Sequence, residues 1–208
     1  MIKKTIISIN IILSILSMFV SLPAMAYNRT NAINYAESYA VNPNSNYRYY
    51  GSSGDCTNFT SQCLYAGGES MVTGTQDSYY VWWYNNFSTP WTWDDVCAYN
   101  WSLASRSYDW QTQNSSPTRG QLKGTYPGTT SVPYPSGVSA GDLFYYDWYG
   151  YGEIDHSSIY VCNGTDPDSG YSGALIDQHS NNVAHEIWSL SYRNTDRNTT
   201  TIYCVHMY

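Results

Sequence analysis

The spacing of apolar residues changes part-way along this chain, and that change limits the fold that the chain can adopt. Segments 28–41 and 56–67 place small and apolar residues at helical intervals, and 94–105 predicts a third helix. From residue 141 onward, short runs rich in β-branched and aromatic residues alternate with Gly, Asn, Asp and Pro turns, as in "DLFYYDWY" and "TIYCVHMY". Helices followed by strands predict an α+β domain, with N-terminal helices packed on a C-terminal antiparallel sheet.

The region between the predicted helices and strands has no periodicity. Residues 111–139 are rich in Ser, Thr, Gly and Pro, which predicts a long loop. No internal repeat and no linker composition is visible in the sequence. Residues 27–208 are therefore expected to form one domain.

The first 26 residues have the composition of an export signal. Lys3 and Lys4 precede a mostly apolar run, and the sequence Ala-Met-Ala at 24–26 has the small-x-small pattern of a signal-peptidase site. Serines dilute the run and a proline follows it, which favours cleavage over a membrane anchor. We expect residues 1–26 to be a signal peptide, and the remaining chain to be secreted by a bacterium without stable membrane insertion.

Net charge and aromatic content narrow the classes of partner. The formal net charge is −7, and removal of Lys3 and Lys4 with the signal peptide would make it −9. A surface of that sign repels nucleic acid and acidic membranes, so neither is expected as a partner. The 23 Tyr and 8 Trp predict a globular protein, because so much aromatic surface is unfavourable in water.

Five cysteines in an exported chain raise the question of which are bridged. Cys56 and Cys63 lie seven residues apart in the second predicted helix, where Asp55 is the expected N-cap. At 1.5 Å per residue they are about 10.5 Å apart along the axis, whereas a disulfide needs Cα atoms within about 7 Å. They therefore cannot pair. Cys56 is favoured as a free nucleophile, because the first turn of a helix stabilises the thiolate.

The other four cysteines could form two disulfides in three ways. We expect Cys63–Cys97 and Cys162–Cys204, since the last two lie in predicted strands that could be neighbours in one sheet. The alternative is that Cys56 is bridged and another cysteine is simply buried.

A thiolate nucleophile needs a base, which is usually a histidine. His156 begins a predicted strand at a sheet edge that a helix N-terminus can face, so it is the candidate base. The base needs an acceptor for its other ring nitrogen, and Asp177 and His179 share one face of the next predicted strand. The pattern leaves both open as the orienting group. His185 and His206 have no such neighbours in the sequence, and no chemistry is assigned to them.

A metal-dependent reaction is the alternative for the same residues. Cys56, His156, Asp177 and His179 could make a zinc set, but the sequence has no CxxC, HxxxH or HExxH spacing. It also has no Gly-rich phosphate loop and no GxGxxG. We expect no metal and no organic cofactor.

Four segments of the chain resemble one known family: "YNRTNAINYAESYAV", "GDCTNFTSQCLYAGG", "GDLFYY…DHSSIYV" and "LIDQHSNN". Together they are similar to the bacterial putative amidase domain, a member of the papain-like superfamily related to the CHAP (cysteine, histidine-dependent amidohydrolase/peptidase) domains. The block DCTNF-x-SQ-x-x-x-AGG is the most specific part. The resemblance covers essentially all of residues 27–208, and it implies a papain-like fold.

The resemblance also implies roles for individual residues. It makes Cys56 the nucleophile and His156 the base. In the CHAP relatives an acidic residue, a glutamine and a polar residue follow the histidine strand, so "DQH" here puts Asp177 at the acidic position. His179 stands where those relatives more often have asparagine. The implied reaction is hydrolysis of an amide through a thioester, with backbone N–H groups at the helix start stabilising the oxyanion. Peptidoglycan peptides and muropeptides are the implied substrates.

A function from a different class is a binding module for cell-wall carbohydrate on a papain-like scaffold. Two aromatic clusters, at 79–87 and 145–151, motivate it, since exposed Trp and Tyr rings stack on sugars. Burial in the core is the more frequent use of such runs. Replacement of Cys56 by alanine separates the two functions, because hydrolysis would be lost and binding would be kept.

Overall fold

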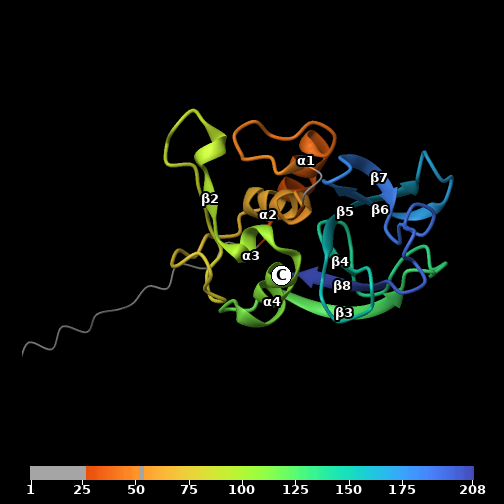
Figure 1. The fold of residues 1–208 in the computed structure, drawn as a ribbon. Helices are drawn as coiled ribbons and strands as arrows, with labels where there is room; N and C mark the ends of the chain where they lie inside the picture. The colour runs from red at the N-terminus through yellow and green to blue at the C-terminus, as the bar shows by residue number, and fades with distance from the viewer. Residues whose placement is uncertain (1–26, 52–53) are drawn as a thin grey trace, which may run out of the picture.

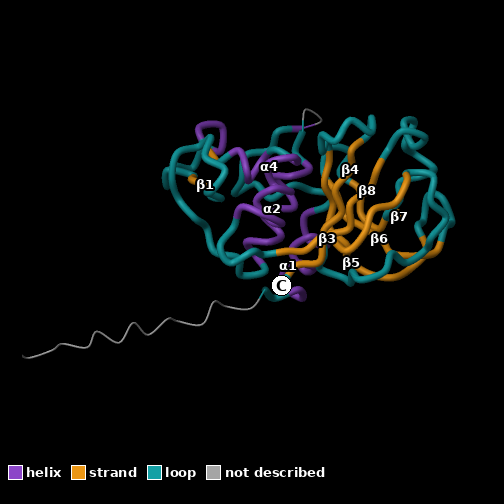
Figure 2. The backbone as a smooth tube through the Cα atoms, turned by 90° about the horizontal axis from the view of Figure 1, so that it is seen from below, coloured by secondary structure: helices purple, strands orange, loops and turns teal. Residues whose placement is uncertain are grey.

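The computed structural model describes residues 27–51 and 54–208. The predicted signal peptide, residues 1–26, lies outside the described residues. In the described part a layer of helices covers one face of an antiparallel sheet (Figures 1 and 2). The α+β class and the order of helices before strands are confirmed. Among the described residues, no helix is both long enough and apolar enough to cross a membrane.

The first two predicted helices are present. Helix α1 spans Arg29–Tyr39, and the side chain of Asn28 caps it by accepting a hydrogen bond from the backbone N–H of Asn31 (3.1 Å). Helix α2 spans Cys56–Ala66 and ends at Gly67. The two helices pack against each other beside the sheet (Figure 1).

The third predicted helix, Asp94 to Ser105, is wrong in its position. The first part of this segment instead contains strand β2. It pairs antiparallel with strand β1, so that Tyr84 lies opposite Cys97. The α-helical residues begin only after this pair. They are interrupted at Leu103, whose backbone is extended (φ −108°, ψ 129°). The elements are β1 (Tyr84–Asn85), a 3₁₀ turn η2 (Thr92–Asp94), β2 (Val96–Cys97), α3 (Tyr99–Ser102), α4 (Ala104–Asp109) and a π-helical turn η3 (Trp110–Asn114).

The main sheet has six strands in the order β3-β8-β4-β5-β6-β7, and every pair is antiparallel. Five of the six strands coincide with runs that the sequence predicts as strands. The strands are β3 (Gly120–Pro127), β4 (Leu143–Asp147), β5 (His156–Thr165), β6 (Ser172–Gln178), β7 (Val183–Ile187) and β8 (Thr201–Met207).

Strand β3 corrects the long loop predicted for residues 111–139. It lies at the edge of the sheet, pairs only with β8, and leaves most of its residues exposed or half-buried. An edge strand that meets water on most positions needs no alternation of apolar side chains. Its polar sequence, which contains a proline, therefore does not show the pattern that predicts a strand.

Apolar side chains fill both sides of the sheet. The helix-facing cluster includes Phe59, Trp82 and Trp101, and the cluster on the other face includes Phe144 and Trp188. Parts of the two aromatic runs at 79–87 and 145–151 belong to these clusters. Strand β5 is buried continuously over its first six residues, so both of its faces lie inside the protein.

The predicted disulfides are absent. All five cysteines lie in the described part of the chain, and all five are free. Cys162 is on β5 and Cys204 is on β8, and β4 lies between those strands, so the two cysteines are not on neighbouring strands. Cys63 is buried in the helix-facing cluster, while Cys97 contacts the Tyr50 hydroxyl. The two expected pairs are therefore wrong.

Candidate active site

Helix α2 is polar in sequence, yet most of it is buried. Nine consecutive residues from Cys56 to Leu64 are buried, so the first two turns have no solvent-exposed face. Buried polar side chains need partners inside the protein. Asn58 is an example, because its Nδ2 donates to the carbonyl of Arg48 (2.8 Å) and its Oδ1 accepts from Trp101 Nε1 (2.9 Å). Such internal hydrogen bonds allow the polar side chains of α2 to be buried in the centre of the protein.

Cys56 is the first residue of α2, and Asp55 occupies the N-cap position. The side chain of Asp55 makes no capping hydrogen bond, contrary to the role expected from the sequence. Instead Oδ1 accepts from the backbone N–H of Tyr50 (2.9 Å) and from Asn58 Nδ2 (2.9 Å), and Oδ2 accepts from His179 (2.5 Å). Asp55 therefore fixes the loop before α2, and its side chain does not bind the backbone N–H groups of the first helical turn.

Hydroxyl groups fix the start of α2 against strand β5. Thr57 Oγ1 and Thr60 Oγ1 each lie 3.1 Å from Ser157 Oγ, and all three residues are buried. Ser157 follows His156 directly, so this contact sets the position of the first residue of β5 relative to Cys56.

The ring of His156 is held from several sides. It stacks on Trp148 (centroids 5.4 Å apart, 28° between planes) and contacts the ring of Tyr146 (5.4 Å). Its Nε2 donates a hydrogen bond to Gln178 Oε1 (2.5 Å). This leaves Nδ1 as the ring nitrogen available to the Cys56 thiol, which lines the same pocket as His156.

The Cys56 thiol and the His156 imidazole change each other's pKa. Burial raises the pKa of Cys56, but the charge and hydrogen bond of His156, with bonds from Ser157 and Thr57, lower that pKa from 9.0 to about 7. Burial lowers the pKa of His156, but the charge and hydrogen bond of Cys56 raise it overall. Both effects favour a thiolate and imidazolium pair.

A second layer of polar groups supports the amide of Gln178. Gln178 Nε2 donates to Glu186 Oε2, and Glu186 Oε1 accepts from Tyr192 OH (3.1 Å) and from Arg193 Nε (2.8 Å). Glu186 and Gln178 are buried. The amide oxygen of Gln178 is therefore turned toward His156, because its amide nitrogen is bound by a carboxylate.

The hydrogen-bond partner of His156 corrects the expectation from the sequence, which offered Asp177 or His179. Asp177 Oδ1 accepts instead from the backbone N–H of His185 (2.9 Å). His179 Nδ1 lies 2.5 Å from Asp55 Oδ2, and its Nε2 lies 2.8 Å from the carbonyl oxygen of Tyr39. Its ring stacks on Phe59 at 4.0 Å. Both residues face the helices, whereas the residue between them reaches His156.

Strand alternation explains why the middle residue of "DQH" is the partner. Ser157 faces the helices through Thr57 and Thr60, so His156, one residue earlier, turns to the other face of the sheet. Gln178 shares that face with Ile176, which packs in the cluster away from the helices. Sequence reasoning missed Gln178 and Glu186, because parity points to Gln178 only once the contacts of Ser157 with α2 are known.

A pocket of about 380 Å³ opens beside Cys56 and His156. Its wall includes Trp148, Gln178 and Arg193. The remaining lining residues come mainly from the loops after β6 and β7, and they include Ser180, Asn181, Leu190, Asn194, Thr195 and Asp196. Volume and mixed polarity are those of a site for a small molecule or a short peptide segment.

The zinc set considered from the sequence does not assemble. Cys56 and His156 lie together, while Asp177 and His179 bind elsewhere. In the part of the chain that the structure describes, one group of three metal-ligating side chains has one ligand atom from each within 4.8 Å of the other two: Glu37, Cys162 and His185. None of these three lines the pocket at Cys56.

Comparison with known proteins gives a family and two relatives. The family model described as "Putative amidase domain" matches residues 26–203. Uncharacterized protein YhbB of Bacillus subtilis is 31% identical over 140 residues, which cover 66% of this chain and 38% of that protein. Uncharacterized protein YjcM of the same organism is 56% identical over 41 residues, which cover 20% of this chain and 10% of that protein. The chain thus spans well under half of these curated relatives. No solved structure matches it.

Proposed function

Because the chain belongs to the putative amidase domain family, we propose that it is a cysteine-dependent amidohydrolase or peptidase that cleaves an amide bond through a thioester. The observation that carries this proposal is that Cys56, the first residue of α2, lines one pocket with His156, which helps to lower the pKa of the thiol to about 7. A thiol of that pKa is about half ionised at neutral pH, whereas an ordinary thiol is mostly protonated.

In the proposed reaction the Cys56 thiolate attacks the carbonyl carbon of the amide. A C–S bond forms while the carbonyl π electrons move to oxygen, and backbone N–H groups at the start of α2 stabilise that oxyanion. The His156 imidazolium then gives its proton to the departing nitrogen, and the C–N bond breaks. Water, deprotonated by the neutral imidazole, attacks the thioester, and the acid product leaves with Cys56 regenerated.

Gln178 and Glu186 have a positioning role in this proposal. The hydrogen bond from His156 Nε2 to Gln178 fixes the imidazole so that Nδ1 points at sulfur. Gln178 is neutral, so it orients the ring without the full negative charge of a carboxylate beside it. Glu186 in turn holds the orientation of the Gln178 amide.

The arrangement supports a papain-like fold as part of the proposal. The nucleophile begins a buried helix, the base begins a strand of an antiparallel sheet, and a side-chain amide orients the base. Triads are recognised by such geometry and roles rather than by sequence position.

The proposed substrates are peptidoglycan peptides or muropeptides, met outside the cell after export. Charged residues of both signs line the pocket, namely Arg193, Asp155 and Asp196, and Trp148 adds an aromatic wall. A stem peptide carries both carboxylates and amines, so it offers groups that such a lining can bind.

The test is hydrolysis of purified muropeptides and of a panel of N-acyl amino acid amides, with product masses that identify the cleaved bond. Cys56→Ala should abolish hydrolysis, and Cys162→Ala is the matched cysteine control that should retain it. Mass spectrometry of the parent enzyme stopped at short times should find the acyl group on the peptide that contains Cys56. Hydrolysis at the parent rate by Cys56→Ala would contradict the proposal.

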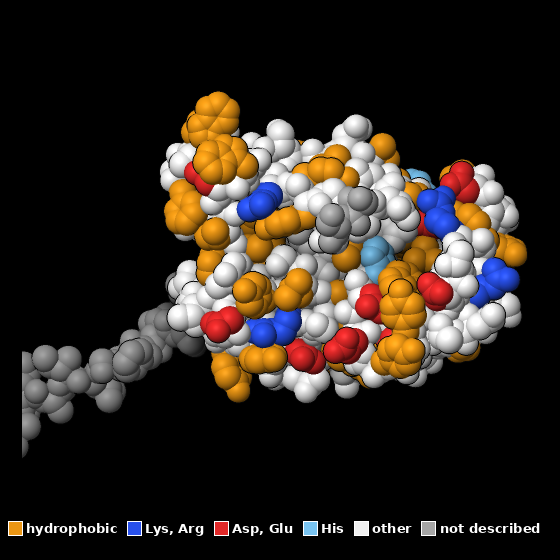
Figure 3. Space-filling view, viewed as in Figure 1, with side chains coloured by type: hydrophobic (Ala, Val, Ile, Leu, Met, Phe, Trp, Pro, Cys, Tyr) orange, Lys and Arg blue, Asp and Glu red, His pale blue; other side chains and the backbone are white. Residues whose placement is uncertain are grey.

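A second candidate function, binding of cell-wall carbohydrate, has one observation in its favour. Phe87, Trp91 and Trp93 are 53%, 61% and 71% exposed. They belong to the segment that projects from the helical side of the molecule, where Figure 3 shows hydrophobic side chains gathered. In a sedimentation assay with insoluble peptidoglycan, this function predicts that Cys56→Ala still binds and that a Trp91→Ala/Trp93→Ala variant does not. Equal sedimentation of both variants would remove this candidate.

A further inference from the structure

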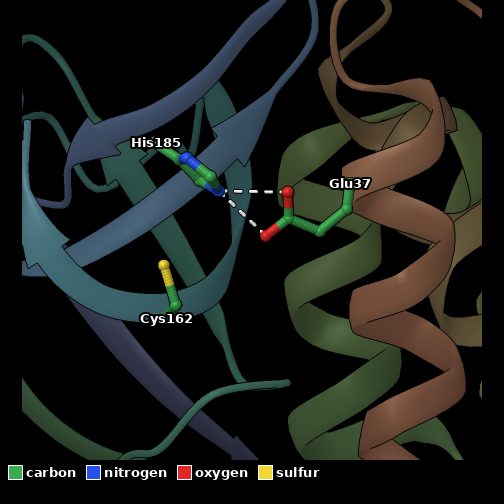
Figure 4. Close-up of side chains that lie close together, drawn as sticks. All are labelled: Glu37, Cys162 and His185. Atoms are coloured by element: carbon green, nitrogen blue, oxygen red, sulfur yellow. Dashed lines mark hydrogen bonds and ion pairs between the residues drawn. The ribbon is translucent and has the colours of Figure 1, made fainter. Parts of the chain in front are cut away.

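A second cysteine and histidine lie together on the helix-facing side of the sheet, away from the pocket. His185 Nε2 lies 2.9 Å and 3.0 Å from the two carboxylate oxygens of Glu37, and the sulfur of Cys162 points toward the same space (Figure 4). One ligand atom from each of the three side chains lies within 4.8 Å of the other two. The residues come from α1, β5 and β7, so three separate elements converge on one point.

Irregularities in two neighbouring strands accompany this convergence. In β5 the register shifts between Tyr160 and Cys162, and Cys162 packs against both apolar clusters, including the helix-facing one. In β7 the register shifts opposite Asp177, and His185 adopts a left-handed backbone (φ 59°). Bulges commonly re-aim a side chain next to a functional site, and a left-handed backbone costs free energy at a non-glycine residue.

Asp177 supplies an independent observation at this place. It is fully buried, and its Oδ1 accepts the backbone N–H of His185. Its Oδ2 has no hydrogen-bond partner among the described residues. A buried carboxylate with one unpartnered oxygen, beside a histidine and a cysteine, fits the surroundings of a cation.

We propose that Glu37, Cys162 and His185 bind a zinc ion. Thiolate, imidazole and carboxylate are the ligand types of protein zinc sites, and calcium and magnesium take oxygen ligands instead. Tetrahedral coordination places donor atoms roughly 3.5 Å apart, so shifts of about 1 Å would close the present set around the ion. Three protein ligands leave the fourth coordination position of the ion open. Water can reach this position, because the side chains of Glu37 and His185 are 38% and 42% exposed.

Binding of zinc would replace the thiol proton of Cys162. Burial raises the pKa of this thiol, and the negative charges of Glu37 and Asp177 raise it further. A divalent cation reverses that electrostatic balance, because it stabilises the thiolate and the carboxylate together. The site would bridge α1 to the sheet, and Asp177 would hold the backbone of His185 behind it.

The test is titration with Zn²⁺ alone against a chromophoric chelator, under mild reduction, on a Cys56→Ser background that removes the pocket thiol. We expect one zinc per chain, and a rise in melting temperature with zinc. Loss of an outer partner already costs about 10- to 100-fold in affinity, so loss of the Cys162 sulfur in Cys162→Ala should cost more than about 100-fold.

Matched variants and cobalt test whether Cys162 itself is a ligand of the ion. Cys204→Ala and Glu153→Gln in the same background should bind zinc like the parent, while Glu37→Gln and His185→Gln should weaken binding. Co²⁺ should give a thiolate-to-cobalt charge-transfer band in the Cys56→Ser protein that disappears in Cys162→Ala. A band that persists in Cys162→Ala, or zinc affinity that is the same in Cys162→Ala and Cys204→Ala, would overturn the proposal. Neither result depends on hydrolytic activity.

Discussion

Two regions of this protein contain a cysteine, a histidine and a glutamate, and they differ in how the three are arranged. At the start of α2, Cys56 contacts His156, and the glutamate stands two hydrogen bonds away behind Gln178. At the other cluster the glutamate contacts the histidine directly and also lies near the sulfur of Cys162. A histidine, which can carry positive charge, is therefore nearest to the Cys56 sulfur, whereas a negatively charged glutamate lies near the Cys162 sulfur.

The difference appears in the two thiol pKa values. Both thiols are penalised by burial, but His156 lowers the pKa of Cys56 to about 7, while the charge of Glu37 raises that of Cys162. A neutral amide between histidine and carboxylate lets the histidine act on the sulfur. Direct contact of carboxylate and histidine instead leaves the second thiol protonated unless a cation replaces the proton. The position of the carboxylate thus separates a candidate nucleophile from a candidate metal ligand.

The strongest way to break the comparison is His156→Ala. Without the imidazole, the Cys56 thiol loses the charge and hydrogen bond that most strongly oppose the effect of burial on its pKa, and the leaving nitrogen loses its proton donor. We expect the kcat/KM for amide hydrolysis to fall by more than about 10³-fold. His185→Ala is the control, and it should stay within a few-fold of the parent. Comparable losses in the two variants would mean that the clusters do not differ in function.

A smaller effect is expected from the group that orients His156. Gln178→Ala should lower kcat by about 10²-fold, because a misplaced imidazole reacts poorly, and KM should change less. Asp177→Asn should leave kcat nearly unchanged, since Asp177 binds the His185 backbone and not the His156 ring. Steady-state kinetics on both variants measure this. A larger loss in Asp177→Asn would restore the role expected from the sequence.

The pH dependence of alkylation compares the two thiols inside one molecule. The Cys56 thiolate is lost as pH falls through about 7, so its reaction with iodoacetamide should reach half of its maximal rate near pH 7. Cys162 should reach that point above pH 9.0, because its pKa is raised. Peptide mapping after short labelling, without zinc, gives both profiles. Identical midpoints would refute the electrostatic difference.

The smallest effect concerns the pair of His185 and Glu37 itself. Both side chains are part-exposed, so in the absence of zinc the ion pair should contribute less than about 1 kcal/mol to the free energy of unfolding. Urea denaturation of His185→Gln measures this, and the difference from the parent should grow when zinc is added. A cost of several kcal/mol without zinc would indicate that the pair itself holds α1 on the sheet.

The sequence predicts the parts of this structure that depend on local periodicity. Apolar spacing predicts helices α1 and α2, and the same reasoning places Cys56 at a helix start. Strand β3 cannot be found in this way, because its exposed edge position leaves no apolar pattern. The pairing of cysteines fails for a related reason, since strand order is not encoded in the local pattern.

The orienting group of His156 is missed because both faces of the sheet are buried. Strand β5 is buried over its first six residues and β6 over its last six, so no polar face distinguishes the helix side from the other side near His156. Asp177 and His179 are correctly expected to share a face, but which face holds His156 depends on Ser157 and its contacts with α2. Such a contact between distant segments is a tertiary feature that alternation alone does not reveal.

The position of β8 in the sheet sets the order in which the protein can be completed. Residues 201–207 pair with β3 on one side and β4 on the other, and β3 pairs with no other strand of the sheet. As the chain emerges during synthesis, β4 to β7 can form a ladder that already contains His156 and Gln178, while β3 waits for residues made about 75 positions later. Contacts of such long sequence separation form late and slowly. A nascent chain therefore has His156 and Gln178 assembled on an unfinished sheet, with the edge of β4 open until β8 inserts.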